Sequence, residues 1–174
     1  RGYGHEVVEY TKDNRGIGQS GKVGLAIGTV WAANSFHEIS QIIENVKPDV
    51  IHVHNTVPLI SPAVYYAAAR FRTPVVQTLH NYRLLCPNGL LQRDGSVCEL
   101  CVGKLIAWPG VRFACYRGNR SASMTLGASL AVHRVIGTWR RKVTTYIALS
   151  EFSRRKMIEG GLPEDRIGVK ANFA

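Results

Sequence analysis

Polar side chains that are able to do chemistry follow three apolar stretches of the chain. The stretches and the residues after them are 49–53 with His54, Asn55 and Thr56, 75–79 with His80, Asn81, Tyr82 and Arg83, and 144–149 with Ser150 and Glu151. Imidazole exchanges a proton near neutral pH, and amide and guanidinium groups bind hydroxyls and anions. If the three stretches lie side by side, these residues form one polar site.

The four cysteines form a second candidate site. Cys86, Cys98, Cys101 and Cys115 have the spacing C-x11-C-x2-C-x13-C, so one C-x2-C pair lies between two single cysteines. This spacing favours a closed zinc site in which all four thiolates are ligands and which holds together a segment poor in core residues. Free or disulfide-paired thiols and an iron–sulfur cluster are the alternatives.

The polar residues need a sheet to bring them together, and the pattern of the chain indicates one. Apolar runs typical of buried parallel strands alternate with stretches of helical periodicity. We expect strands at 49–53, 75–79, 144–149 and 166–170, and helices at 34–46, 62–71, 120–142 and from Ser150 to about 158. This alternation predicts an α/β fold with a parallel sheet and helices on both faces. Ligands bind such a sheet at the carboxyl ends of its strands.

Three other segments do not follow this alternation. Residues 6–11 are rich in β-forming residues, and residues 12–23 are polar and glycine-rich, which is typical of a loop. Residues 83–119 lack a clean period and contain all four cysteines, so we interpret them as an irregular insertion. His52 alternates with apolar neighbours inside an expected strand and faces the side opposite to Ile51 and Val53, and we interpret it as a core or helix-contacting histidine rather than a ligand.

The charge of the chain favours an anionic partner. The 174 residues include 22 Lys and Arg against 12 Asp and Glu, a formal net charge of +10. From Leu100 to Ser150 there are eight basic residues and no acidic one, with Trp108, Phe113, Tyr116 and Trp139 interleaved. This pattern excludes an acidic disordered tail and favours a phosphate-bearing substrate or an anionic membrane surface. Nucleic acid is disfavoured because no helix-turn-helix or zinc-finger pattern occurs. The sequence contains no run of 18 apolar residues, so it predicts no membrane-spanning helix.

Three segments together resemble a known family. They are KPDVIHVHN at 47–55, TPVVQTLHNYRLLCPNG at 73–89 and TTYIALSEFSRRKMIEGGLPEDRIGVKANF at 144–173. In this order they resemble retaining glycosyltransferases of family four, which have the GT-B fold, and in particular the subgroup with a cysteine-bearing insertion. The resemblance implies that residues 1–174 form the N-terminal, acceptor-side Rossmann-like domain, truncated at both ends, with the insertion at about 83–119. It also implies a C-terminal donor-binding domain that this sequence lacks, so we expect the isolated chain to be inactive.

The resemblance also implies roles for single residues. His80 matches the family's histidine that contacts the transferred sugar and supports the transition state, and we expect it to be catalytic. The acceptor-binding residues that we expect are His54, Asn55, Asn81, Tyr82, Arg83, Ser150 and Glu151. The co-substrate implied is a nucleotide-sugar, and the acceptor a glycan or a lipid-linked saccharide. Transfer then takes place in the cytoplasm, with the protein peripheral on the inner face of the membrane.

A different class of function is the alternative. In it, the chain is a zinc-stapled α/β binding module for an anionic partner, either a membrane surface or nucleic acid, without transferase activity. The cysteine spacing and the basic stretch carry this alternative.

Overall fold

The computed structural model describes residues 4–13 and 22–172. Its helices are α1 (Lys22–Val30), α2 (Ala33–Val46), α3 (Ala63–Arg70), α4 (Trp108–Arg112), α5 (Arg120–Val135), α6 (Thr138–Arg141) and α7 (Glu151–Glu159), with the 3-10 helix η2 (Glu164–Arg166). Its strands are β1 (Ile51–Val53), β2 (Val75–Leu79), β3 (Gln92–Arg93), β4 (Ser96–Val97), β5 (Thr145–Ala148) and β6 (Ile167–Val169).

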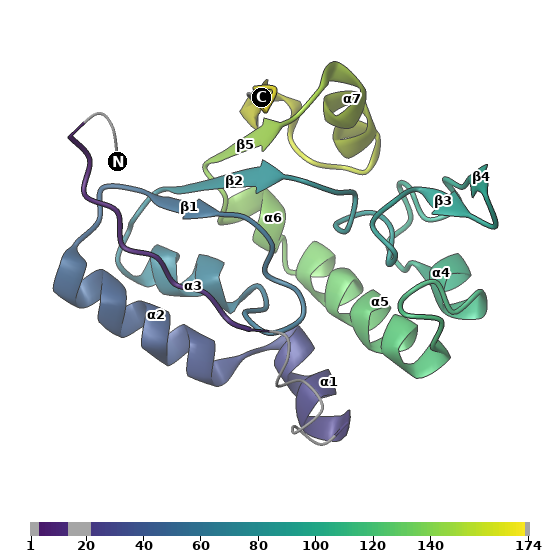
Figure 1. The fold of residues 1–174 in the computed structure, drawn as a ribbon, viewed down its shortest axis with the longest axis horizontal. Helices are drawn as coiled ribbons and strands as arrows, with labels where there is room; N and C mark the ends of the chain where they lie inside the picture. The colour runs from purple at the N-terminus through teal and green to yellow at the C-terminus, as the bar shows by residue number, and fades with distance from the viewer. Residues whose placement is uncertain (1–3, 14–21, 173–174) are drawn as a thin grey trace.

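The main sheet has four parallel strands in the order β1-β2-β5-β6 (Figure 1). Each strand neighbours the one that precedes it in this sheet, and α3 and α7 lie in two of the crossovers. The register pairs Val53 with Gln77 and Leu79 with Ala148. The predicted parallel α/β fold is therefore confirmed, and its strands end at one edge, as ligand binding to such a sheet requires.

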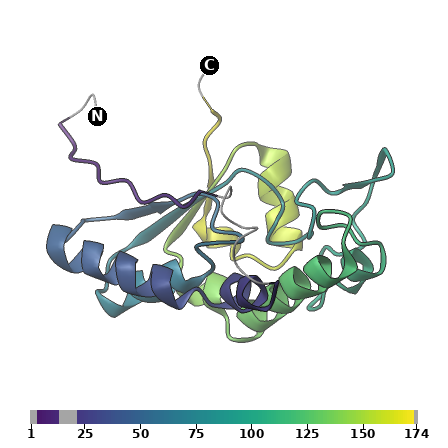
Figure 2. The same cartoon turned by 60° about the horizontal axis from the view of Figure 1, so that its bottom comes forward.

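Helices pack on this sheet around one hydrophobic core. Figure 2 shows α2, α3 and α5 in one layer beside the strands. The side chains of Tyr65 on α3 and Tyr146 on β5 are fully buried at its centre. Tyr65 donates a hydrogen bond to Gln77 Oε1 at 2.9 Å, and Tyr146 donates to the Trp139 carbonyl at 2.8 Å. Burial of both aromatic rings with their hydroxyls bonded stabilises the sheet–helix packing.

The helix predicted at 120–142 is broken into α5 and α6. Gly137 lies between them with φ of 72°, in the left-handed region that glycine adopts without strain. A further helix, α1, lies where no helix was predicted. Residues 6–11 form no strand, and none of the described strands pairs with them. Of the predicted loop at 12–23, residues 14–21 lie outside the described part of the chain.

The 83–119 segment contains the β3–β4 hairpin, the short helix α4 and turns. In Figure 1 it lies beyond the end of β2, on the side of the sheet edge where β1 also ends. Arg134 of α5 anchors it by donating to the carbonyls of Leu84, Lys104 and Leu105. None of the helices that the structure describes is long and apolar enough to cross a bilayer.

Candidate functional site

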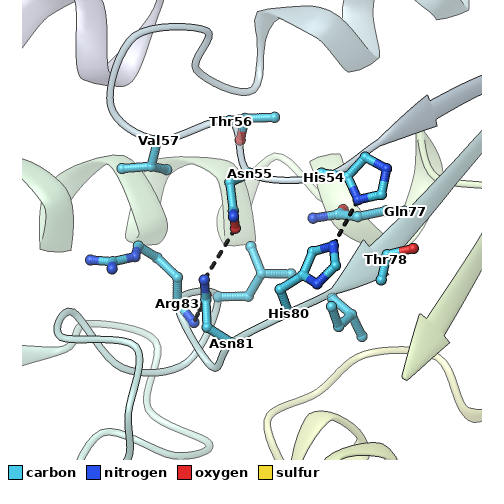
Figure 3. Close-up of a pocket in the computed structure, with 11 residues that line it drawn as sticks. His54, Asn55, Thr56, Val57, Gln77, Thr78, His80, Asn81 and Arg83 are labelled. Atoms are coloured by element: carbon cyan, nitrogen blue, oxygen red, sulfur yellow. Dashed lines mark hydrogen bonds between the residues drawn. The ribbon is translucent and has the colours of Figure 1, made fainter. Parts of the chain in front are cut away.

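The parallel pairing of β1 and β2 brings the two strand-end histidines together. Val53 pairs with Gln77, so the chain leaves both strands at the same edge of the sheet. There His54 Nδ1 lies 2.7 Å from His80 Nε2, and the two rings stack with centroids 5.0 Å apart (Figure 3). Only one of two facing ring nitrogens donates, so this hydrogen bond requires at least one neutral imidazole.

His52 extends the pair into a row of three rings. Its centroid lies 4.3 Å from that of His54, and its Nε2 lies 2.7 Å from Thr78 Oγ1. The prediction of a core histidine is wrong, because His52 is exposed and stacks on a residue of the site. Side chains two residues apart on a strand share one face, so the spacing of His52 and His54 in the sequence indicated that their rings lie together.

The environment of His52 and His54 favours unprotonated rings. Partial burial is the main cause that lowers the pKa of His54, and positive charge on His52 and His80 lowers it further. The pKa of His52 is also lowered by burial first, and then by charge on His80 and Lys170. Since imidazole ordinarily titrates near about 6.5, both rings are mainly neutral at neutral pH.

A pocket of about 220 Å³ opens beside the histidine pair. It is lined by β2 and by the loops that follow β1 and β2, namely His54, Asn55, Thr56, Val57, Gln77, Thr78, Leu79, His80, Asn81, Arg83 and Leu84 (Figure 3). Asn81 Nδ2 donates to Asn55 Oδ1 at 3.1 Å and so joins the two loops. The pocket therefore offers imidazole, amide, hydroxyl and guanidinium groups, which together bind a ligand rich in hydroxyls.

The loop after β2 is folded on itself and holds Arg83 at the pocket. Tyr82 N–H donates to the Gly89 carbonyl at 2.8 Å, and Arg83 Nη1 donates to the Pro87 carbonyl at 2.8 Å. Gly89 has φ of +79°, and a Cβ there would lie 3.3 Å from Arg83 Nη2. A glycine at this position therefore lets the backbone turn closely around the guanidinium.

The structure brings together five of the eight residues expected to bind or catalyse. His54, Asn55, His80, Asn81 and Arg83 line the pocket, whereas Tyr82, Ser150 and Glu151 do not. Ser150 Oγ accepts a hydrogen bond from Ser153 N–H at 3.1 Å and is the N-cap of α7. Tyr82 contacts the Phe152 ring edge-on, with centroids 6.3 Å apart, so the start of α7 lies beside this loop.

Gln77 and Thr78 also line the pocket, although neither was among the predicted site residues. Both lie inside the strand β2 and are buried, so they look like core positions in the sequence. Their polar character within an apolar run was the available signal.

The four cysteines lie near one another without forming a metal site. Burial is the main cause that raises the pKa of Cys101, and Cys86, Cys98 and Cys115 are close enough to raise it further. All four are free thiols, and in residues 4–13 and 22–172 no group of three or more His, Cys, Asp or Glu is arranged to hold a metal ion. Cys86 Sγ instead donates to Asn88 Oδ1 at 3.0 Å. The prediction of a closed zinc site with four thiolate ligands is therefore not supported.

Comparison with known proteins gives three similarities. The model of the family described as Glycosyltransferase Family 4 matches residues 4–173. An uncharacterized 42.6 kDa protein in the cps region of Klebsiella pneumoniae is 30% identical over 124 residues, which make up 71% of this chain and 26% of that protein. The chain thus spans about a quarter of the length of this relative. A structure of UDP-N-acetylglucosamine 2-epimerase from Rickettsia bellii is 14% identical with a TM-score of 0.43, over 79% of this chain and 26% of that one.

Proposed function

The chain belongs to glycosyltransferase family 4, and on this premise we propose that it is the acceptor-binding part of an enzyme that transfers a sugar from a nucleotide-sugar. The acceptor is a glycan or a lipid-linked saccharide, and the sugar keeps its anomeric configuration. A second Rossmann-like domain of the same protein binds the donor, and the present chain alone is inactive. The relative from a cps region supports a role in polysaccharide biosynthesis.

One observation carries the proposal. His80 follows β2 at the sheet edge, lines the pocket and is hydrogen-bonded to His54 at 2.7 Å. This bond occupies Nε2 of His80, and no hydrogen bond of its Nδ1 to another described residue occurs. Nδ1 is therefore available to a hydroxyl of a bound sugar.

The histidine pair suits a group that must be oriented before transfer. In the reaction, the bond between the sugar and the leaving nucleoside diphosphate breaks, the acceptor oxygen bonds to the same carbon, and the hydroxyl proton passes to the departing diphosphate. A ring fixed by a hydrogen bond to His54 contacts the transferring sugar without reorganising, which is how preorganised polar groups favour a transition state. His54 sets the tautomer of His80 and is a positioning residue.

The polar wall of the pocket binds the acceptor in this proposal. Asn81 uses its Nδ2 for Asn55 and its Oδ1 for the Arg83 N–H, and so holds Asn55, whose own Nδ2 forms no hydrogen bond to another described residue and can bind a sugar hydroxyl. Arg83 adds a cation to the lining of the same pocket. Tyr82, Ser150 and Glu151 belong to the neighbouring wall, and contact an acceptor only if it extends toward α7.

An anionic membrane surface is the second partner that we propose, at the cytoplasmic face. Large apolar side chains are exposed next to basic ones in the carboxylate-free stretch from Leu100 to Ser150. Exposed fractions are 54% for Leu105, 56% for Ile106, 62% for Trp108, 58% for Met124 and 68% for Val135. Exposed apolar groups interleaved with Lys and Arg are typical of proteins that rest on anionic lipid.

The alternative of a zinc-stapled binding module without transferase activity has less support. Its metal site is not arranged in the described residues, and the family match covers residues 4–173. Charge alone remains for a nucleic-acid partner, and charge does not distinguish nucleic acid from lipid.

The test is transfer by the full-length protein. Labelled UDP-, GDP- and dTDP-sugars are supplied in turn together with lipid extract from the cells that make the protein. We expect one donor to label a lipid-linked or glycan product, whose new linkage has the anomeric configuration of the donor by NMR. Absence of labelled product with every donor, or an inverted linkage, contradicts the proposal.

A further inference from the structure

A second pocket of about 320 Å³ continues from the first one. Val57 and Arg83 line both pockets, so the two share a wall. The remaining lining residues are Pro58, Asn88, Cys115, Tyr116 and Arg117. No role for this second pocket follows from the histidine site.

Two guanidinium groups converge on one aromatic ring in this pocket. Arg83 Cζ lies 5.2 Å and Arg117 Cζ 5.4 Å from the centroid of Tyr116. Tyr116 is itself held in place, because its backbone N–H donates to Ser123 Oγ at 2.9 Å and Ser123 is fully buried. The ring contacts both cations by cation–π interaction, and N–H groups of Arg117 and those of Arg83 other than Nη1 stay free for another partner.

The two positive charges are not neutralised within the described residues. Neither Arg83 nor Arg117 forms an ion pair there, and Arg117 makes no hydrogen bond through its side chain. Asp94, whose charge acts on Cys115 of the same pocket, pairs with Arg93 at 3.4 Å. Both guanidinium groups line the pocket and keep a positive charge that an anion in the pocket can pair with.

The donors that remain fit a phosphate. Arg83 uses Nη1 for the Pro87 carbonyl, which fixes its guanidinium and leaves its other N–H groups. Arginine binds phosphate oxygens through two parallel N–H groups, which lysine does not do. The neighbouring Asn88 is not available in the same way, because its Oδ1 accepts from Leu90 N–H and its Nδ2 donates to the Gln92 carbonyl.

We propose that Arg83, Arg117 and Tyr116 form a site for the diphosphate group of a lipid-linked acceptor, next to the sugar-binding pocket. This inference rests on the proposed function for the identity of the ligand. Arg83 lines both pockets, so the diphosphate lies on one side of it and the acceptor sugar on the other side, toward His80. A donor nucleotide carries the same diphosphate chemistry, and the experiment must separate the two sources.

The experiment measures binding of inorganic pyrophosphate to the purified full-length protein by calorimetry at low ionic strength. We expect Arg117→Ala to weaken binding roughly tenfold or more, because a charge-assisted bidentate contact is lost. Arg117→Lys should give an intermediate affinity, because it keeps the charge without the fork. Arg112→Ala is the matched control, since Arg112 is exposed, lies five positions away and lines neither pocket.

Farnesyl diphosphate and UDP then distinguish an acceptor from a donor. We expect farnesyl diphosphate to compete with pyrophosphate and to lose affinity in Arg117→Ala, while UDP binding is unchanged by this variant. The inference is overturned if pyrophosphate does not bind, if Arg112→Ala weakens it as much as Arg117→Ala, or if UDP alone depends on Arg117. Arg83→Ala is a weaker test because Arg83 also holds its own loop.

The failure of this inference and that of the proposed function are distinguishable. Pyrophosphate binding is read without turnover, and His80→Ala should leave it unchanged. If His80→Ala leaves sugar transfer intact while Arg117→Ala abolishes pyrophosphate binding, the catalytic role fails and an anion site remains. If His80→Ala abolishes sugar transfer while Arg117→Ala leaves pyrophosphate binding intact, the anion site fails and the catalytic role remains.

Discussion

The side chain of Leu85 occupies the space that a Cβ on Gly160 would fill. A Cβ built on Gly160 would overlap the Cδ2 atom of Leu85 and lie 3.0 Å from its Cγ. Leu85 is only 1% exposed, so it has little room to move away. This contact joins the loop that carries Arg83 to the C-cap of α7.

Gly160→Ala should therefore destabilise the protein by about 1 to 3 kcal/mol through overpacking. Urea unfolding measures the change. Gly28→Ala is the control, because a Cβ at Gly28 meets no atom within 4 Å and the position lies in α1. If Leu85 is the obstacle, Leu85→Ala should partly relieve the effect in a double-mutant cycle, and additive effects of the two substitutions contradict this account.

Arg134 should contribute more to the free energy of unfolding than an exposed arginine of the same basic stretch. Its guanidinium donates to the carbonyls of Leu84, Lys104 and Leu105, and burial lowers its pKa. Arg134→Ala leaves these carbonyls without their charged donor and should lower the free energy of unfolding by about 2 to 3 kcal/mol. Arg140→Ala removes the same charge from an exposed position and should change it by less than about 0.5 kcal/mol. Equal effects of the two variants would show that only charge matters here.

His133 should make the protein less stable in acid. It is 2% exposed, its Nε2 donates to the Val30 carbonyl at 3.0 Å, and its Nδ1 then accepts from Thr138 Oγ1 at 2.8 Å. Burial is the main cause that lowers its pKa, while the bond to Val30 opposes the shift. Between this lowered pKa and the ordinary value of about 6.5, the unfolded chain binds a proton that the folded chain does not.

Stability should accordingly be complete above about pH 6.5 and fall as the pH falls toward the folded-state pKa of His133. Urea unfolding at a series of pH values measures the slope. His133→Gln should reduce the slope in this window, whereas His37→Gln, at an exposed position of α2, should leave it unchanged. An unaltered slope in His133→Gln would assign the acid sensitivity to other groups.

The histidine row should make sugar transfer sensitive to acid. A protonated His54 can only donate through Nδ1, so its 2.7 Å contact with His80 then fixes His80 Nε2 as the acceptor and removes the choice of tautomer that the pair has while His54 is neutral. Activity should fall as the pH falls through the pKa of His54, which burial and the charges of His52 and His80 hold below the ordinary value. His52→Gln removes one of these charges, so the acidic limb should move to higher pH. If the acidic limb of the pH profile stays at the same pH, the charge of His52 does not lower the pKa of His54.

The sequence predicted the parts of this structure that repeat a simple pattern. Apolar runs predicted β1, β2, β5 and β6, and the polar residues after β1 and β2 predicted the pocket. The break at Gly137 was missed because the apolar positions of α5 and α6 share a helical period, and a single glycine does not by itself end a helix. The pairing of Arg83 and Arg117 on Tyr116 was not predictable, since it joins two loops without regular structure.

The zinc prediction shows the limit of spacing as evidence. The cysteines do come near one another, as their spacing indicated, yet the loop geometry directs Cys86 to Asn88. His52 shows the opposite case. Strand periodicity contained the information that it shares a face with His54, but its apolar neighbours favoured a core position.

The most direct test of the central claim is the rate of sugar transfer by His80→Ala in the full-length protein, with the donor identified as above. We expect kcat to fall by roughly 10² to 10⁴, with the thermal unfolding midpoint unchanged because His80 is exposed. His37→Ala, an exposed histidine that lines neither pocket, should keep the unsubstituted rate. A His80→Ala protein that transfers sugar as fast as His37→Ala would contradict the assignment of this pocket as the site of transfer.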